Sequence, residues 1–126
     1  MTKKIFLLLI AVLSAGIAFA KTNDDFCQAD LDKILKGGKE FIAAKLEGAD
    51  LHCMDLSGAD FRGAELEKAN LQKANLSNAN FQNADLEEAN LKGAKIDGAI
   101  FSGAELEYAT WTDGRVCAEG SIGGCW

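Results

Sequence analysis

The sequence predicts an all-β solenoid, in which the chain winds into a rod of about four square coils of 20 residues each. Two observations lead to this fold class. From Ala44 onward a five-residue unit repeats fourteen times without an insertion, thirteen units begin with Ala, and each has a large apolar residue at its centre. In addition, phenylalanine recurs every twenty positions, at Phe41, Phe61, Phe81 and Phe101. A repeat at a fixed period is typical of a solenoid, in which each coil packs only on its neighbours.

A period of five suits neither of the regular elements. On an α-helix it scatters the central residues around the axis by about 140° per step, and on a straight strand it sends them to alternate faces. Both problems disappear if the Ala and the central residue point inward and the other three residues turn the chain by a quarter. Four units then close one coil, and the central residues form four columns: Phe41, Phe61, Phe81 and Phe101; Leu46, Leu66, Leu86 and Leu106; Leu51, Leu71, Leu91 and Trp111; Leu56, Leu76, Ile96 and Val116.

The beginning of the chain predicts export. Lys3 and Lys4 precede an apolar stretch, and Ala18-Phe19-Ala20 fits a cleavage site, so residues 1–20 are interpreted as a signal peptide. A retained membrane anchor is the less favoured alternative. The remaining chain has 11 basic and 19 acidic residues, a formal charge of −8. We therefore expect a periplasmic or secreted protein that has no membrane segment after cleavage.

Both ends of a solenoid expose core and unpaired backbone, and caps are expected to cover them. Residues 21–38 predict a short N-terminal capping helix, with Asp24 or Asp25 as its N-cap and Gly37-Gly38 at its end. The β-helix is expected over 39–116, and residues 117–126 predict a Gly-rich C-terminal cap closed by a disulfide.

Four cysteines in an exported chain predict two disulfides, for which three pairings exist. Cys53 and Cys117 lie about three coils apart, roughly 14 Å along the axis, which is too far for a bridge. Pairing Cys27 with Cys117 and Cys53 with Cys125 would stretch both terminal segments along the whole rod. The favoured pairs are Cys27 with Cys53 and Cys117 with Cys125. A metal site is the weaker interpretation, because there is no C-x-x-C and only His52 could assist.

Outward charge is predicted to gather on the wall that carries the Leu46 column. We call this surface the acidic wall, and Lys45 and Lys68 are its only bases; its acidic residues are Glu47, Glu65, Glu67, Asp85, Glu87, Glu88, Glu105 and Glu107. The wall is either a docking surface for a basic protein or a solubilising face without a partner. Calcium capture is less favoured than either, because Ca²⁺ takes about 6–8 converging oxygens. No cofactor or metal is expected.

The repeated A-(D/N)-(L/F)-x-x units resemble the pentapeptide repeat family from Lys39 to about Ala118. The resemblance implies a right-handed quadrilateral β-helix with the central residue and the Ala inside. It also implies an alternative function, since some members mimic duplex DNA and inhibit or protect DNA gyrase. The favoured function is a non-enzymatic scaffold that acts by contact, because a filled rod offers no cleft with convergent polar groups. The negative charge argues against nucleic acid as the partner. The oligomeric state stays open.

Overall fold

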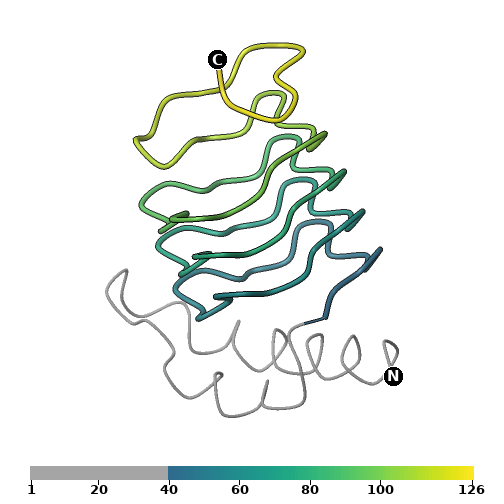
Figure 1. Ribbon diagram of the computed structural model, residues 1–126. Coiled ribbons are helices and arrows are strands. Elements are labelled where there is room, and N and C mark those ends of the chain that lie inside the picture. The colour runs from purple at the N-terminus through teal and green to yellow at the C-terminus, as the bar shows by residue number, and fades with distance from the viewer. Residues whose placement is uncertain (1–39) are drawn as a thin grey trace.

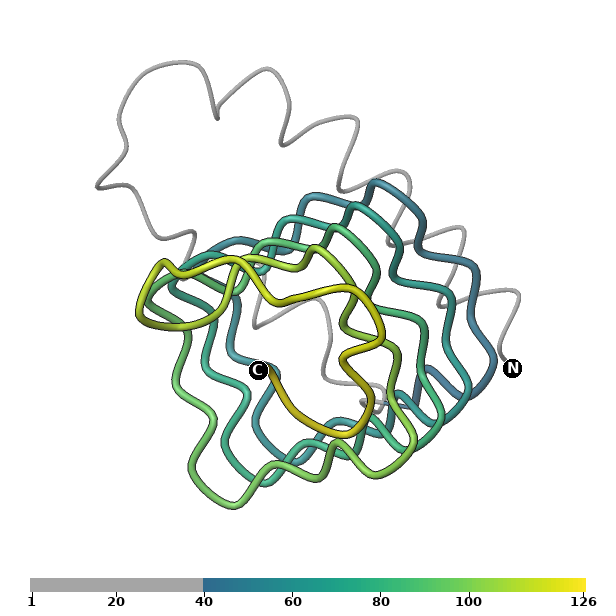
Figure 2. The same cartoon turned by 90° about the horizontal axis from the view of Figure 1, so that it is seen from above.

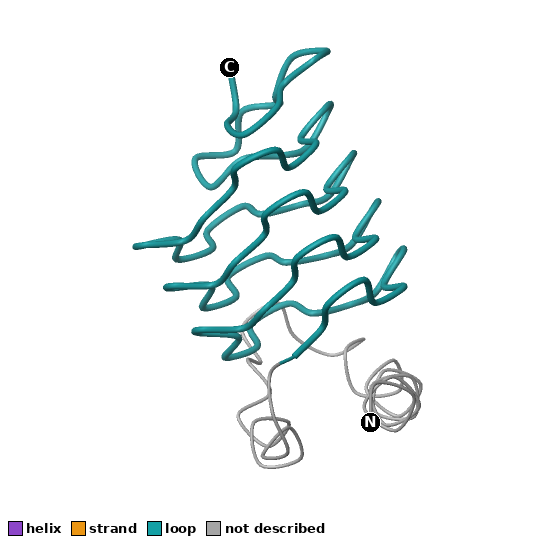
Figure 3. Ribbon diagram, turned by 45° about the vertical axis from the view of Figure 1, so that its right-hand side comes forward, coloured by secondary structure: helices purple, strands orange, loops and turns teal. Residues whose placement is uncertain are grey.

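The computed structural model describes residues 40–126, and within them the chain rises as a stack of coils (Figure 1). The segments predicted as a signal peptide, 1–20, and as a helical cap, 21–38, lie outside these residues. Along 40–126 the backbone forms neither a helix nor a continuous strand, and neighbouring coils are joined by single-residue β-bridges instead (Figure 3). The same residues include no helix that is long and apolar enough to span a membrane.

Each coil is held to the next by parallel bridges between residues twenty positions apart. Glu65 illustrates the pattern: its N–H donates to the Ala44 carbonyl at 2.9 Å, and its carbonyl accepts from Leu46 N at 2.7 Å. Bridges of this kind run from Glu40↔Asp60 to Asn90↔Thr110 along all four walls. Because successive coils pair in register, equivalent side chains are stacked directly above one another.

A tight turn after each central residue makes the corner. Ala44 N donates to the Phe41 carbonyl at 3.0 Å, and the same bond closes the later corners. The third residue of each turn has a positive φ, which a type II turn requires and which Gly and Asn tolerate best. Gly48, with φ of 66°, and Asn78, with φ of 59°, are examples. Because this turn occurs once in each unit, a new wall begins every five residues.

The interior is filled by the predicted columns. The four phenylalanine rings stack in parallel, with centroids 4.8, 4.9 and 5.1 Å apart in order along the chain. Phe61, Phe81 and the leucines between them are fully buried, as are most of the alanines that open the units, whereas Ala44 and Ala99 are partly buried. Seen along the axis, the coils superpose as rings around this single core (Figure 2). The prediction of an all-β solenoid with four inward columns is confirmed, except for the last residue of the fourth column, Val116.

Val116 does not continue the fourth column, and this prediction is wrong. Its side chain is 63% exposed, and the residue forms an antiparallel bridge with Thr110 on the neighbouring wall. The physical reason is a reversal of the chain at Gly114, which has φ of 89° and donates its N–H to the Trp111 carbonyl at 2.9 Å. Ile96, the column member one coil below the expected place of Val116, is only partly buried.

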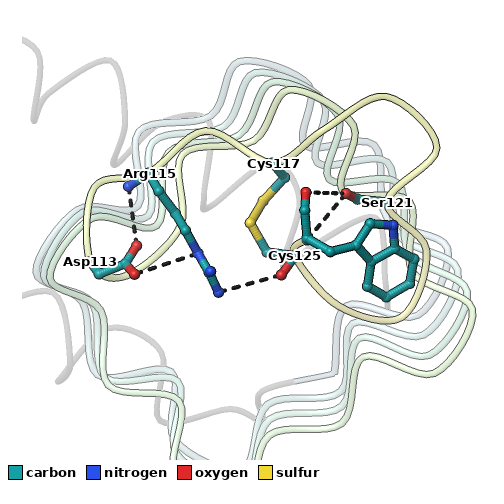
Figure 4. Close-up of a disulfide and its surroundings, with 6 residues drawn as sticks. Asp113, Arg115, Cys117, Ser121 and Cys125 are labelled. Carbon is teal, nitrogen blue, oxygen red and sulfur yellow. Dashed lines mark hydrogen bonds and ion pairs between the residues drawn. A yellow bond between two sulfur atoms is a disulfide. The ribbon is translucent and has the colours of Figure 1, made fainter.

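The C-terminal segment after this reversal folds back over the last coil as a cap. Ile122 bridges antiparallel to Glu105, and Cys117 is buried at 1% exposure. The Cys117–Cys125 disulfide is present, with a Cα–Cα distance of 4.9 Å, and lies across the end of the coil (Figure 4). Cys53 is also disulfide-bonded. Its predicted partner, Cys27, lies outside the described residues.

Candidate interaction surface

The acidic wall is built by the register of the coils. Parallel bridges join Lys45 to Glu65, Glu65 to Asp85 and Asp85 to Glu105, so that these side chains form one outward row. A second row consists of the residues that directly follow the leucines of the Leu46 column: Glu47, Glu67, Glu87 and Glu107. Coils pair at about 4.8 Å, so like charges in one row are close neighbours. The structure thus stacks seven of the eight sequence-predicted acidic residues in two neighbouring rows.

Glu87 lies at the centre of this face, and its pKa is raised above the ordinary value for glutamate. Partial burial is the largest cause, followed by the negative charge of Asp85 and then of Glu107, Glu105 and Glu67. Asp85 approaches Glu87 because its Oδ1 accepts a hydrogen bond from the Glu87 backbone N–H at 3.0 Å. The carboxylates therefore repel one another, and a cationic group placed here relieves that repulsion.

Two lysines oppose the acids, and one of them is already engaged. Lys68 Nζ lies 3.1 Å from Glu67 Oε1 and 4.0 Å from Glu88 Oε1. The hydrogen bond to Glu67 and the charges of Glu67 and Glu88 raise the pKa of Lys68. Lys45 lies at the end of the row nearer the N-terminus, in the bridge with Glu65. The half of the wall nearer the C-terminus, around Glu87, keeps its excess negative charge.

Three of the carboxylates come close enough to face a single cation. Oxygen atoms of Asp85, Glu87 and Glu105 lie within 4.8 Å of one another. Three ligands on an open wall fall short of the 6–8 oxygens that Ca²⁺ prefers, and Asp85 already accepts a hydrogen bond from the backbone. The arrangement suits the ammonium or guanidinium group of a partner better than a bare metal ion.

Glu119 adds to the acidic wall, and sequence reasoning missed it. This cap residue contacts Tyr108, whose pKa is raised mainly by the charge of Glu119, then by burial, and then by the charge of Glu107. The repeat could not predict this approach, because the cap folds back antiparallel and does not follow the five-residue period.

The Asp and Asn side chains of the other walls are used to hold the turns. Asn70 Oδ1 accepts from Gln72 N at 3.2 Å, and Asn90 Oδ1 accepts from Lys92 N at 3.1 Å, a local bond that side-chain amides commonly make in turns. His52 also takes part in this local bonding. Its Nδ1 lies 2.6 Å from Asp50 Oδ1, which also accepts from Asn70 Nδ2 at 3.2 Å. These polar groups stabilise the local backbone.

Replacing Glu87 with glutamine is expected to raise the melting temperature at pH 7 by roughly 1–3 °C, because it removes one charge from a repelling row. The raised pKa means that the folded state binds this proton more tightly than the unfolded state. Stability from this group therefore falls as pH rises from the ordinary glutamate value through the raised one. The benefit of Glu87→Gln should vanish near pH 3. Thermal unfolding followed at both pH values measures it, and an equal gain at pH 3 would contradict the electrostatic explanation.

A family model for pentapeptide repeats matches the chain in eight copies, over residues 40–78 and 74–109. Solved structures of pentapeptide repeat proteins also match. One, from Nostoc PCC 7120, is 36% identical with a TM-score of 0.59, and the match covers 65% of this chain and 69% of that one. A pentapeptide repeat protein from the thylakoid lumen of Arabidopsis thaliana is 30% identical with a TM-score of 0.57, covering 68% and 66%.

A third structure, the pentapeptide repeat protein Rfr23 from the cyanobacterium Cyanothece 51142, is 33% identical with a TM-score of 0.50, and the match covers 57% of this chain and 53% of that one. The search of curated proteins found no match.

Proposed function

Because the chain belongs to the pentapeptide repeat family, whose members fold as right-handed quadrilateral β-helices and serve as structural or interaction modules, we propose that it is a scaffold that binds a basic protein through its acidic wall. The observation that carries this proposal is the register of the coils, which stacks Glu65, Asp85 and Glu105 in one unbroken row beside a second row of glutamates.

The rest of the described surface and interior supports binding at this wall over catalysis. Ser121 is the one polar residue buried within 40–126, and otherwise the core consists of apolar side chains and Cys117. Such an interior has no polar cleft in which a reaction could take place. On the wall that carries the column of Phe61 and Phe81, which we call the phenylalanine wall, Asp60 is by contrast neutralised by Arg62, whose Nη2 lies 2.7 Å from Asp60 Oδ2. This pairing of charges on another wall supports the acidic wall as the contact surface.

A flat acidic wall fits a partner that presents several lysine or arginine side chains at once. Each cation finds two or more carboxylates nearby, as the cluster of Asp85, Glu87 and Glu105 illustrates. Binding of this kind draws on long-range attraction and on paired charges at the contact, so it weakens as salt screens the surface. DNA gyrase, the target of DNA-mimicking members of the family, is the alternative partner and an outcome of the test.

The proposal is tested with a fluorescent octalysine peptide as the probe, followed by fluorescence anisotropy at low salt. Reversing two charges at the centre of the wall, with Glu67→Lys and Glu87→Lys together, is expected to weaken binding by about tenfold or more, since each added lysine repels the probe as well as removing an acid.

The matched control reverses two exposed acids on other walls, with Glu40→Lys and Asp97→Lys together, and changes the net charge equally. This control should lose less than about threefold in affinity. Equal losses in the two variants would mean that only net charge matters, and that the wall is a solubilising face. Inhibition of gyrase supercoiling by the wild type, lost in the wall variant, would favour the DNA-mimic alternative.

We also propose that the protein is exported. The Lys3-Lys4 start, the apolar stretch and the Ala18-Phe19-Ala20 site support this, and so does the Cys117–Cys125 disulfide, since disulfides persist in oxidising compartments. Cell fractionation with sequencing of the N-terminus tests it. A chain in the periplasm or medium beginning at Lys21 is expected, and a cytoplasmic chain beginning at Met1 would contradict it.

A further inference from the structure

The C-terminal cap covers two walls of the last coil and leaves the other two open. One coil lower, Leu76 N donates to the Lys95 carbonyl and Phe81 N donates to the Ile100 carbonyl, at 2.8 and 2.7 Å. At the last coil the equivalent donors, Ile96 N and Phe101 N, have no backbone partner anywhere in 40–126. One coil lower the carbonyls of Ala74 and Ala79 accept hydrogen bonds from Lys95 N and Ile100 N. The corresponding carbonyls of the last coil, those of Ala94 and Ala99, have no backbone partner within 40–126. An open β-edge of this kind is a template for pairing.

The outer side of the cap carries a matching set of groups. Val116 and Ile122 bridge antiparallel to Thr110 and Glu105, and the hydrogen bonds of each bridge are made by their neighbours. For Ile122 these are Leu106 N to the Ser121 carbonyl at 2.8 Å and Gly123 N to the Ala104 carbonyl at 2.9 Å. In such a pair the N–H and C=O of the central residue point away from the partner strand. Both groups of Val116 and of Ile122 therefore face outward.

We propose that two copies of this chain associate through their C-terminal ends, each cap covering the open walls of the other copy. A twofold axis perpendicular to the rod, passing through the corner between the phenylalanine and acidic walls, exchanges the capped half with the open half. It places Ile122 of the second copy over Ile100, and Val116 of the second copy over Lys95. The two caps then lie side by side in one layer.

This placement reproduces the hydrogen bonds that join the coils within one chain. Inside the rod, the N–H of the upper bridge residue donates to one carbonyl of the lower coil, and its carbonyl accepts from an N–H two residues further on, as in Glu65 over Ala44 and Leu46. Ile122 of the second copy meets the Ala99 carbonyl and Phe101 N in the same way. Reversal by the twofold axis makes the antiparallel cap run parallel to the coil it covers, as this pattern requires.

The shape of the open edge selects a second copy over an unrelated peptide. The edge follows two walls that meet at a corner after Asp97-Gly98, and a straight strand can pair along only one of them. In addition, Ile100 is 46% exposed and Ile122 is 54% exposed, and the pairing stacks these two side chains on the outer surface. The twofold axis also sets the acidic wall of one copy beside the phenylalanine wall of the other, so the acidic rows do not continue into one another.

Sedimentation equilibrium of the purified, disulfide-intact protein tests the proposal, and the dimer mass is expected at micromolar concentrations. Replacing Ile100 and Ile122 together with aspartate puts like charges opposite each other at two symmetric contacts and should raise the dimer Kd about tenfold. The combination Ile100→Lys with Ile122→Asp makes each contact an opposite-charge pair and should restore the dimer. Within one chain the two residues lie over different walls, so only the contact between copies predicts this rescue.

Ile42→Asp is the matched control, because Ile42 lies on the same wall far from the cap and is 44% exposed. It should leave the dimer unchanged. In the wild-type dimer the amides of Ile96 and Phe101 should exchange with deuterium more slowly as protein concentration rises. A monomer at all concentrations overturns the proposal, as does a ladder of larger assemblies, which would indicate head-to-tail association. A dimer insensitive to the paired aspartates overturns it too. None of these outcomes depends on the acidic wall.

Discussion

Replacing Phe81 with alanine is expected to lower the free energy of unfolding by about 3–5 kcal/mol, the largest effect of any change considered for this protein. The ring is fully buried and stacks between Phe61 and Phe101, with centroid distances of 4.9 and 5.1 Å. Alanine leaves a cavity in the middle of the column, and the coils above and below cannot close it because every wall fixes their spacing through backbone hydrogen bonds. Guanidinium denaturation of wild type and variant measures the loss.

The matched control is Phe81→Leu, since leucine is the central residue in most units of the other walls. It fills most of the space and should cost about 1 kcal/mol. If Phe81→Ala cost no more than Phe81→Leu, the phenylalanine column would not be a packed element of the core, and the stacking account of the solenoid would be wrong.

Removing the Cys117–Cys125 disulfide, by replacing both residues with serine, is expected to cost about 2–3 kcal/mol, because the bridge restricts a short loop in the unfolded chain. It also holds the cap in place. Cys117 is buried, its N–H donates to the Ala109 carbonyl at 2.9 Å, and its carbonyl accepts from Tyr108 N at 3.2 Å. Opening of the cap exposes this end of the core, so the amides of Leu106 and Tyr108 should exchange faster with deuterium.

The control for this prediction is the amide of Leu66, which lies two coils below Leu106 and is fully buried. Its exchange should change only as much as global stability does, because coils in a solenoid contact only their neighbours. Unchanged exchange at Leu106 in the double serine variant would show that the cap is held by its backbone bridges alone.

Periodicity explains how much of the fold could be predicted. Each inward column repeats one residue class at intervals of twenty, and only a coil of four units places such residues above one another. The acidic wall follows from the same register, because a residue beside a buried leucine must face outward. Prediction therefore succeeds for residues such as Phe61 and Glu87, whose neighbours in space are their equivalents in the repeat.

Beyond the last repeat unit, periodicity no longer predicts where a residue lies. Val116 keeps the spacing of its column, yet the chain reverses at Gly114 and pairs antiparallel. No periodic signal marks such a reversal, and the same reversal brings Glu119 to the acidic wall. The pairing of His52 with Asp50 is a different case. An acid two residues before a polar side chain recurs along the chain, as in Asp55 with Ser57 and Asp60 with Arg62, and this pattern could have predicted it.

The central functional claim is that the acidic wall recognises a basic protein, and crosslinking in the compartment where the protein resides tests it most directly. Wild type and the Glu40→Lys with Asp97→Lys control should both crosslink to the same lysine- or arginine-rich protein, which should then bind the purified chain in a salt-dependent manner. The Glu67→Lys with Glu87→Lys variant should lose that partner. Equal recovery of the same partner by all three proteins would contradict the claim.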